Sequence, residues 1–212
     1  MATEQKLEQA GNGETVASVL CTKYNWTPDD RANWRSIAFR EDGVGCLKLL
    51  SDGPGTLLVC EFDWEFNEDY NGPGTAEKKV DTRQEDLEDS LRTRQIAEFA
   101  IDIKFRNSQP REEFGFGSID IEAANSRRLK ETAYEQETFF VRLEVGNFPA
   151  QHDTNPPDSE AYGKTRWAQR LSFQNKSPIP PRDRWRDSFQ GMLEAMNWEI
   201  ETNWFSHKLR GD

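Results

Sequence analysis

The sequence predicts a mainly β fold, an antiparallel up-and-down barrel of about eight or nine strands with one or two short helices. Apolar and charged residues alternate one by one in three stretches, residues 56–66, 96–106 and 197–205. A strand sends successive side chains to opposite faces of its sheet, so each stretch predicts a strand with one apolar face. Neighbouring strands of this kind leave two open edges unless the sheet closes, which favours a barrel over the alternative, a β-sandwich.

The clearest pair of strands surrounds the turn Glu41-Asp42-Gly43, which separates residues 34–40 from residues 44–50. Asp-Gly between two apolar runs predicts a tight hairpin, because glycine accepts the positive φ that the turn requires. A second turn at residues 51–55 leads into the strand 56–66, so these three strands form a meander. The apolar run 16–24 predicts an earlier strand.

Four further strands and one helix are expected in the second half of the chain. The strands cover residues 114–122, 138–145, 167–173 and 197–205, with a bend in the first at Gly115 and Gly117. Residues 187–196 predict a short helix, since Phe189, Met192, Leu193 and Met196 recur at helical spacing behind a cap at Asp187 or Ser188. The prolines of residues 178–181 predict an extended loop.

The domain organisation follows from composition. Residues 1–14 are polar and predict a disordered tail, and residues 15–212 predict a single β-barrel domain. Within it, residues 67–95 are dense in charges of both signs and are expected as a charged insertion.

The formal net charge of −11 argues against nucleic-acid and membrane partners, because both surfaces attract basic proteins. Three cysteines without close pairing and a polar start of the chain predict a cytoplasmic protein. No phosphate-binding glycine loop or zinc-ligand spacing occurs, so no cofactor is expected. His152 and His207 lack a partner at metal-ligand spacing, and the row Glu61, Asp63 and Glu65 is interpreted as a solvated strand face.

Residues 34–66, with their meander and Asp-Gly hairpin, resemble the lipocalin and calycin group of β-barrel proteins. A short helix before the final strand adds to this resemblance. The Gly-x-Trp motif of lipocalins is absent here, and Tyr24-Asn-Trp26 takes its place without the glycine. The resemblance implies a barrel that holds a small apolar molecule, and some lipocalin-like proteins of natural-product pathways act as cyclases or isomerases without a cofactor.

The apolar strand faces therefore define the candidate site. As catalytic residues, Tyr24 and Glu137 are expected to supply a hydrogen bond or a proton to a substrate held in a reactive fold. The function expected is a cofactor-independent cyclase or isomerase acting on a small apolar molecule. A carrier of such a ligand and a solid-core scaffold for protein binding remain as alternatives. The expected ligand-binding residues share the inward strand faces: Cys60, Phe62, Trp64, Phe99, Ile101, Phe105, Phe139, Val141, Gln169, Trp198, Thr202 and Trp204.

Overall fold

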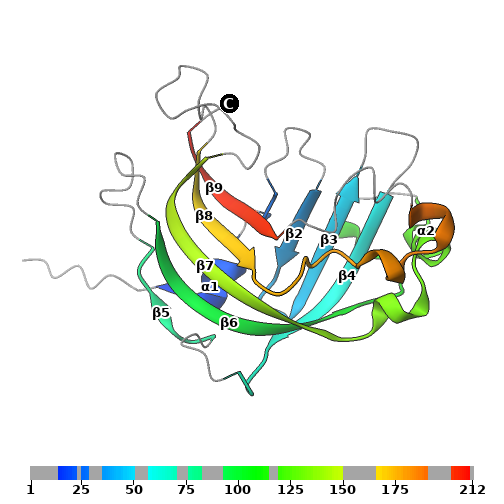
Figure 1. Ribbon diagram of the computed structural model, residues 1–212, viewed down its shortest axis with the longest axis horizontal. Helices are drawn as coiled ribbons and strands as arrows, with labels where there is room; N and C mark the ends of the chain where they lie inside the picture. The colour runs from blue at the N-terminus through cyan, green and yellow to red at the C-terminus, as the bar shows by residue number, and fades with distance from the viewer. Residues whose placement is uncertain are drawn as a thin grey trace, which may run out of the picture.

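The computed structural model describes residues 14–22, 25–28, 35–50, 57–70, 76–82, 93–114, 119–149, 166–190 and 202–210. Their dominant element is a seven-stranded antiparallel sheet in the order β2-β3-β4-β6-β7-β8-β9 (Figure 1). A second, two-stranded sheet pairs β1 (Glu14–Thr15) with β5 (Lys79–Val80). The strands of the large sheet are β2 (Arg35–Phe39), β3 (Val44–Leu50), β4 (Leu57–Phe66), β6 (Arg94–Phe105), β7 (Glu137–Pro149), β8 (Arg166–Phe173) and β9 (Asn203–Arg210). The prediction of a mainly β, antiparallel fold is confirmed.

The β2–β3 hairpin forms where the sequence predicts it. Gly43 has φ +77°, and the backbone N–H of Val44 donates to Asp42 Oδ1 at 3.1 Å, which fixes the turn. Gly45 follows on β3 and lies opposite Phe62 on β4. A Cβ at Gly45 would lie 2.2 Å from the Phe62 ring, so a larger residue there would displace this ring from the core.

The alternating faces are also confirmed, because the rings of β4 and β6 pack into one hydrophobic core. Phe39 contacts Phe62 and Trp64 edge to face, with ring centroids 5.5 and 5.4 Å apart. Phe62 contacts Phe105 in the same way at 5.8 Å. Edge-to-face pairs at this spacing add to the stability that burial already provides.

The opposite face of β3 and β4 is covered by the segment that follows β6, which corrects one sequence prediction. Residues 114–122 were expected as a strand, but Glu112–Phe114 form the 3₁₀ helix η1 and Ile121–Arg128 form the helix α2. Asp120 caps α2 by accepting from the N–H of Ala123 at 2.9 Å. Phe114 and Ile121 pack against Cys46 and Val59 as a second, smaller core. Residues 115–118, with their expected bend, lie outside the described residues.

Residues 16–24 were also expected as a strand, but Val16–Leu20 form the helix α1. The side chains of Thr15 and Ser18 each accept a hydrogen bond from the backbone N–H of the other residue, which is a capping box. The apolar residues Val16, Val19 and Leu20 recur at spacings of three and one, so helical geometry places all three in the main core. The local cap therefore prevails over the β-branched composition of this run.

The two edge strands of the large sheet, β2 and β9, both bond to one short segment. Trp26 exchanges two backbone hydrogen bonds with Ile37 on β2, at 2.9 and 2.8 Å. Thr27 exchanges two with Phe205 on β9, at 2.9 and 2.6 Å. The strongly curved sheet thus brings its first and last strands to the same two residues (Figure 1).

The chain after β8 crosses to the end of the sheet that carries α2 (Figure 1). There Trp185, after the 3₁₀ helix η3 (Arg182–Arg184), forms a β-bridge with Leu129. The 3₁₀ helix η2 (Glu131–Tyr134) follows Leu129 and leads into β7. Of the predicted helix 187–196, residues 187–190 are helical and the rest lies outside the described residues. The predicted strand 197–205 is observed from Asn203, within β9. In the described part of the chain, no helix has the length and apolar character that crossing a membrane requires.

Candidate functional site

A cleft of about 280 Å³, including the solvent at its mouth, lies between the ends of β6 and β7 and the segment 178–184. Its lining is mainly apolar, with three charged side chains among the eleven residues. The floor is formed by side chains of the sheet, and prolines form the opposite wall. The lining residues are Ile103, Phe105, Ala133, Glu135, Glu137, Phe139, Pro178, Ile179, Pro180, Pro181 and Arg184. An apolar concavity with a few polar groups is the usual form of a small-molecule site.

The charged side of the cleft is a chain of ion pairs centred on Glu137, the first residue of β7. Its Oε1 accepts from Arg184 Nη2 at 3.0 Å, and its Oε2 accepts from Lys176 Nζ. Arg184 also reaches Glu135 through Nη1 at 3.2 Å. Both carboxylate oxygens of Glu137 are therefore occupied by cations, and the ammonium of Lys176 lies 4.7 Å from the centre of the Phe139 ring.

The proline wall is held in place by backbone contacts. The indole N–H of Trp185, which is fully buried, donates to the carbonyl of Pro180 at 2.8 Å. The N–H of Ile179 donates to Ser177 Oγ at 3.2 Å, and Ile179 is buried in the main core. Prolines fix φ and have no N–H to satisfy, so this wall keeps an extended shape without a strand partner.

The expected site residues fall into several groups. Glu137, Phe105 and Phe139 come together around the cleft. Gln169 and Trp204 lie on β8 and β9, outside the cleft lining, and Thr202 is half-buried just before β9. Tyr24 and Trp198 lie outside the described residues. The remaining residues belong to the packed core: Cys60, Phe62, Trp64, Phe99, Ile101 and Val141.

The sequence did not predict the part of the cleft that comes from residues 133–135 and 178–184. Arg184 carries the charge on this wall, but it lies 47 residues from its partner Glu137. The prolines at residues 178–181 did predict an extended segment. No pattern in the sequence indicated which end of the sheet this segment covers.

A buried polar cluster surrounds Cys60 on β4. Asn125 on α2 donates from Nδ2 to the carbonyl of Val59 at 2.6 Å and to Cys60 Sγ at 3.3 Å. Burial raises the pKa of the Cys60 thiol. Burial also raises the pKa of the Tyr134 hydroxyl, and the nearby Cys60 adds a smaller contribution in the same direction. Both groups are therefore neutral near pH 7, and neither is an activated nucleophile or base.

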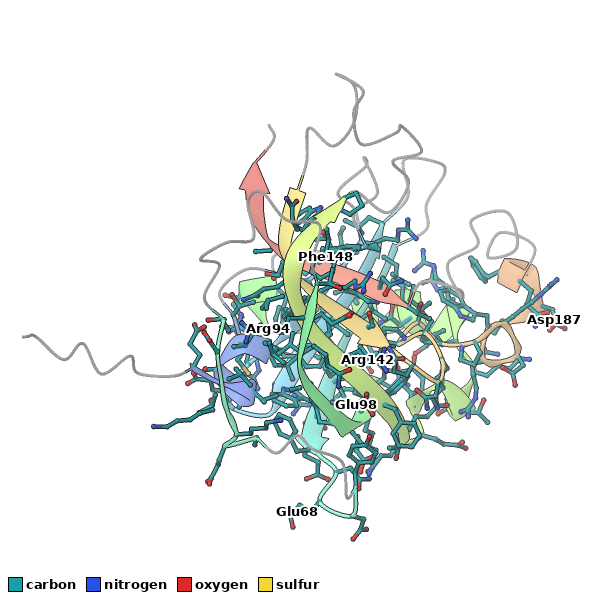
Figure 2. The ribbon with its side chains drawn as sticks, turned by 60° about the vertical axis from the view of Figure 1, so that its left-hand side comes forward. Glu68, Arg94, Glu98, Arg142, Phe148 and Asp187 are labelled. Carbon is teal, nitrogen blue, oxygen red and sulfur yellow. The ribbon has the colours of Figure 1, made fainter. Side chains whose placement is uncertain are left out.

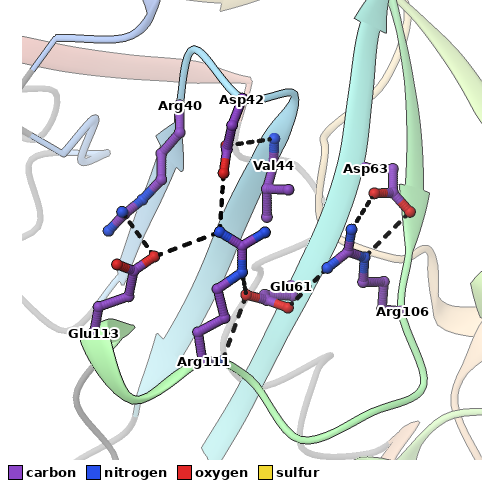
Figure 3. A network of polar contacts seen from close by, with 8 residues as sticks. All are labelled: Arg40, Asp42, Val44, Glu61, Asp63, Arg106, Arg111 and Glu113. Atoms are coloured by element: carbon purple, nitrogen blue, oxygen red, sulfur yellow. Dashed lines mark hydrogen bonds and ion pairs between the residues drawn. The ribbon is translucent and has the colours of Figure 1, made fainter.

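The acidic row of β4 faces away from the aromatic core, as expected, but one of its members is not solvated. Glu61 is only 3% exposed and binds Arg106 Nη1 at 3.1 Å and Arg111 Nε at 3.2 Å (Figure 3). Asp63 accepts two hydrogen bonds from Arg106, so the arginines pin residues 106–111 onto the strand. Across the residues that the structure describes, no group of three or more acidic, histidine or cysteine side chains is arranged to hold a metal ion.

The outer side of β6 and β7 carries a charged surface. Glu98 on β6 binds Arg142 on the neighbouring strand at 3.2 Å, and Arg94 lies further along β6 (Figure 2). Tyr70 donates to Glu98, and its ring lies 5.5 Å from that of Phe140, which is 40% exposed. Cross-strand pairs of this kind stabilise a solvated sheet face and supply no enclosed site.

Comparison with known proteins identifies no relative: no family model, no curated protein and no solved structure matches this chain.

Proposed function

We propose that this protein binds a small, mostly apolar molecule in the cleft at the end of β6 and β7. One observation carries the proposal: the side chains of Ile103, Phe105 and Phe139, which belong to the main core, also form the floor of an open concavity. When a ligand covers apolar surface that is in contact with water, the complex is stabilised by roughly 25 cal/mol for each Å² of surface buried.

The size and charge of the cleft limit the ligand. The enclosed part of the cleft holds only about 10 Å³, so most of a ligand would lie over its open mouth. A flat aromatic molecule is therefore favoured over a long lipid. The acids and bases at the rim neutralise each other in pairs. A ligand without net charge is therefore favoured, because a charged one would have to break these pairs.

The ion pairs at the rim of the cleft favour binding of a ligand without chemical conversion. A rearrangement catalysed by Glu137, as expected from the sequence, needs a carboxyl group that is free to exchange a proton. Both oxygens of Glu137 are instead engaged by Lys176 and Arg184. The cyclase or isomerase activity stays a prediction that requires one of these pairs to open.

We further propose that the large sheet is a lipocalin-like barrel closed through Trp26 and Thr27. Support comes from the four backbone hydrogen bonds by which these residues reach Ile37 on one edge strand and Phe205 on the other. A closed sheet would leave no long unpaired edge, and its open ends would be the natural places for ligand entry.

The experiment is a fluorescence titration with the uncharged probe N-phenyl-1-naphthylamine, whose emission rises in apolar surroundings. The proposal predicts saturable binding that Ala133→Phe weakens at least tenfold, because the added ring fills the cleft. Ala123→Phe on α2 is the matched control, since Ala123 does not line the cleft. Equal binding by both variants, or none by the unmodified protein, would contradict the proposal.

A further inference from the structure

Among the described residues, four polar side-chain atoms on β8 and β9 are buried without a hydrogen-bond partner: Trp167 Nε1 near the start of β8, and the group of three formed by Gln169 Oε1, Trp204 Nε1 and Ser206 Oγ. In this group, Gln169 is 6% exposed, and the other two residues are fully buried. Buried polar groups in native proteins nearly always have a partner, so each exception calls for an explanation.

The three residues lie next to one another on one face of the sheet. Gln169 pairs with Ser206 across β8 and β9, and two residues along the same strands Leu171 pairs with Trp204. Since alternate residues of a strand share a face, Gln169, Trp204 and Ser206 all lie on the face of Leu171. Leu171 and Trp204 belong to the main core, so this is the inner face.

Other buried tryptophans of the same core show what is unusual about Trp204. Trp26 and Trp185 are equally buried, and their indole N–H groups donate to the carbonyls of Leu20 and Pro180 at 3.0 and 2.8 Å. Trp64 donates to the carbonyl of Arg40 at 3.2 Å. The fold therefore supplies these indoles with acceptors, whereas the indoles of Trp204 and of Trp167 on β8 have none among the described residues.

We infer that Gln169, Trp204 and Ser206 form a second binding site, which takes the hydroxyl group of an uncharged, otherwise apolar molecule. A hydroxyl donates one hydrogen bond and accepts two, which matches an amide oxygen, an indole N–H and a serine hydroxyl. The neighbouring inner positions Val145 and Leu171 are apolar, and Arg35, a buried cation on the inner face of β2, already has an interaction of its own. A carboxylate would lose its hydration there without compensation.

This site is separate from the cleft and does not depend on the proposed function. Along β7, Val145, which pairs with Gln169, lies six positions beyond Phe139 in the cleft. At about 3.3 Å for each residue of a strand, that is roughly 20 Å.

One experiment monitors both sites. The ¹⁵N–¹H spectrum of the tryptophan indoles is recorded while 1-octanol is added. Trp204 reports the second site, and Trp185 reports the cleft through its bond to Pro180, a lining residue. We expect the indole signal of Trp204, assigned with Trp204→Phe, to shift saturably. Sodium octanoate should need at least a tenfold higher concentration for the same shift.

The variants Gln169→Leu and Ser206→Ala should each weaken the response of Trp204 to 1-octanol at least fivefold. Ser172→Ala is the control on the opposite face of β8, where Ser172 donates to Asn203 Oδ1 at 2.7 Å, and it should leave the response unchanged. A Trp204 signal that 1-octanol does not move, or that moves equally in all variants, would overturn the inference. Trapped water would then account for the three polar atoms.

Discussion

Arg184 and Glu137 face each other across the rim of the cleft, with Nη2 and Oε1 3.0 Å apart. Each side chain is only about one fifth exposed, at 20% and 21%. This pair joins the segment that carries the proline wall to the first residue of β7, so it links the two sides of the cleft.

Glu137→Gln should lower the free energy of unfolding by about 1–2 kcal/mol, because the variant leaves Lys176 and Arg184 without their shared carboxylate. Glu135→Gln is the matched control: Glu135 bonds the same Arg184 but is 63% exposed, so its loss should stay below about 0.5 kcal/mol. Urea unfolding measures both values. Equal losses would show that the rim pair adds nothing beyond a surface contact.

Glu61→Gln should lower the free energy of unfolding by about 2–3 kcal/mol, since it leaves Arg106 and Arg111 facing a neutral amide at a buried position. The partial exposure of both arginines keeps the loss below that of a fully buried pair. Glu65→Gln, on the same face of β4 but exposed, should change stability by less than about 0.5 kcal/mol. A Glu61 variant as stable as the Glu65 variant would refute this account.

Asp42 links the β2–β3 turn to acid stability. The hydrogen bond from Arg111 holds the pKa of Asp42 below its usual value, helped by the N–H of Val44. A group with a lowered pKa stabilises the folded state above its unfolded pKa of about 3.9 and loses this effect as the pH falls further. Asp42→Asn should therefore be less stable than the unmodified protein at pH 6, and the two should converge towards pH 2. A constant difference across this range would exclude the linkage.

The thiols of Cys21 and Cys46 should react slowly with Ellman's reagent in the folded protein. Burial raises the pKa of each to about 12, so only a fraction on the order of 10⁻⁴ is thiolate at pH 8. Buried Cys60 should behave in the same way. All three thiols should react at once in 6 M guanidinium chloride. Rapid reaction of one equivalent without denaturant would reveal an exposed thiol and contradict this placement.

The sequence predicted the sheet where alternation and turn chemistry act over a few residues. The Asp42-Gly43 hairpin and the aromatic face of β4 follow from such local rules. Two predicted strands are helices instead: the capping box of Thr15 and Ser18 starts α1, and the cap at Asp120 starts α2. Both helices use apolar residues that pack on the core as well as a strand would, so the apolar run alone does not distinguish the two forms.

The candidate site was only partly predictable. The faces of β6 and β7 placed Phe105 and Phe139 together, because strand parity and sheet order follow from the sequence. The position of Arg184 depends on the β-bridge between Trp185 and Leu129, a contact between residues 56 positions apart. No local pattern encodes a contact of this range, and the cleft exists only once that contact is made.

The most direct test of cleft binding is a set of nuclear Overhauser contacts between N-phenyl-1-naphthylamine and the isoleucine methyl groups. Ile103 and Ile179 line the cleft, Ile37 of β2 is buried in the core, and Ile119 is 49% exposed on the surface. We expect contacts from the bound probe to the methyl groups of Ile103 and Ile179 and none to the other two. Contacts confined to Ile119, or a probe that touches none of the four, would contradict it.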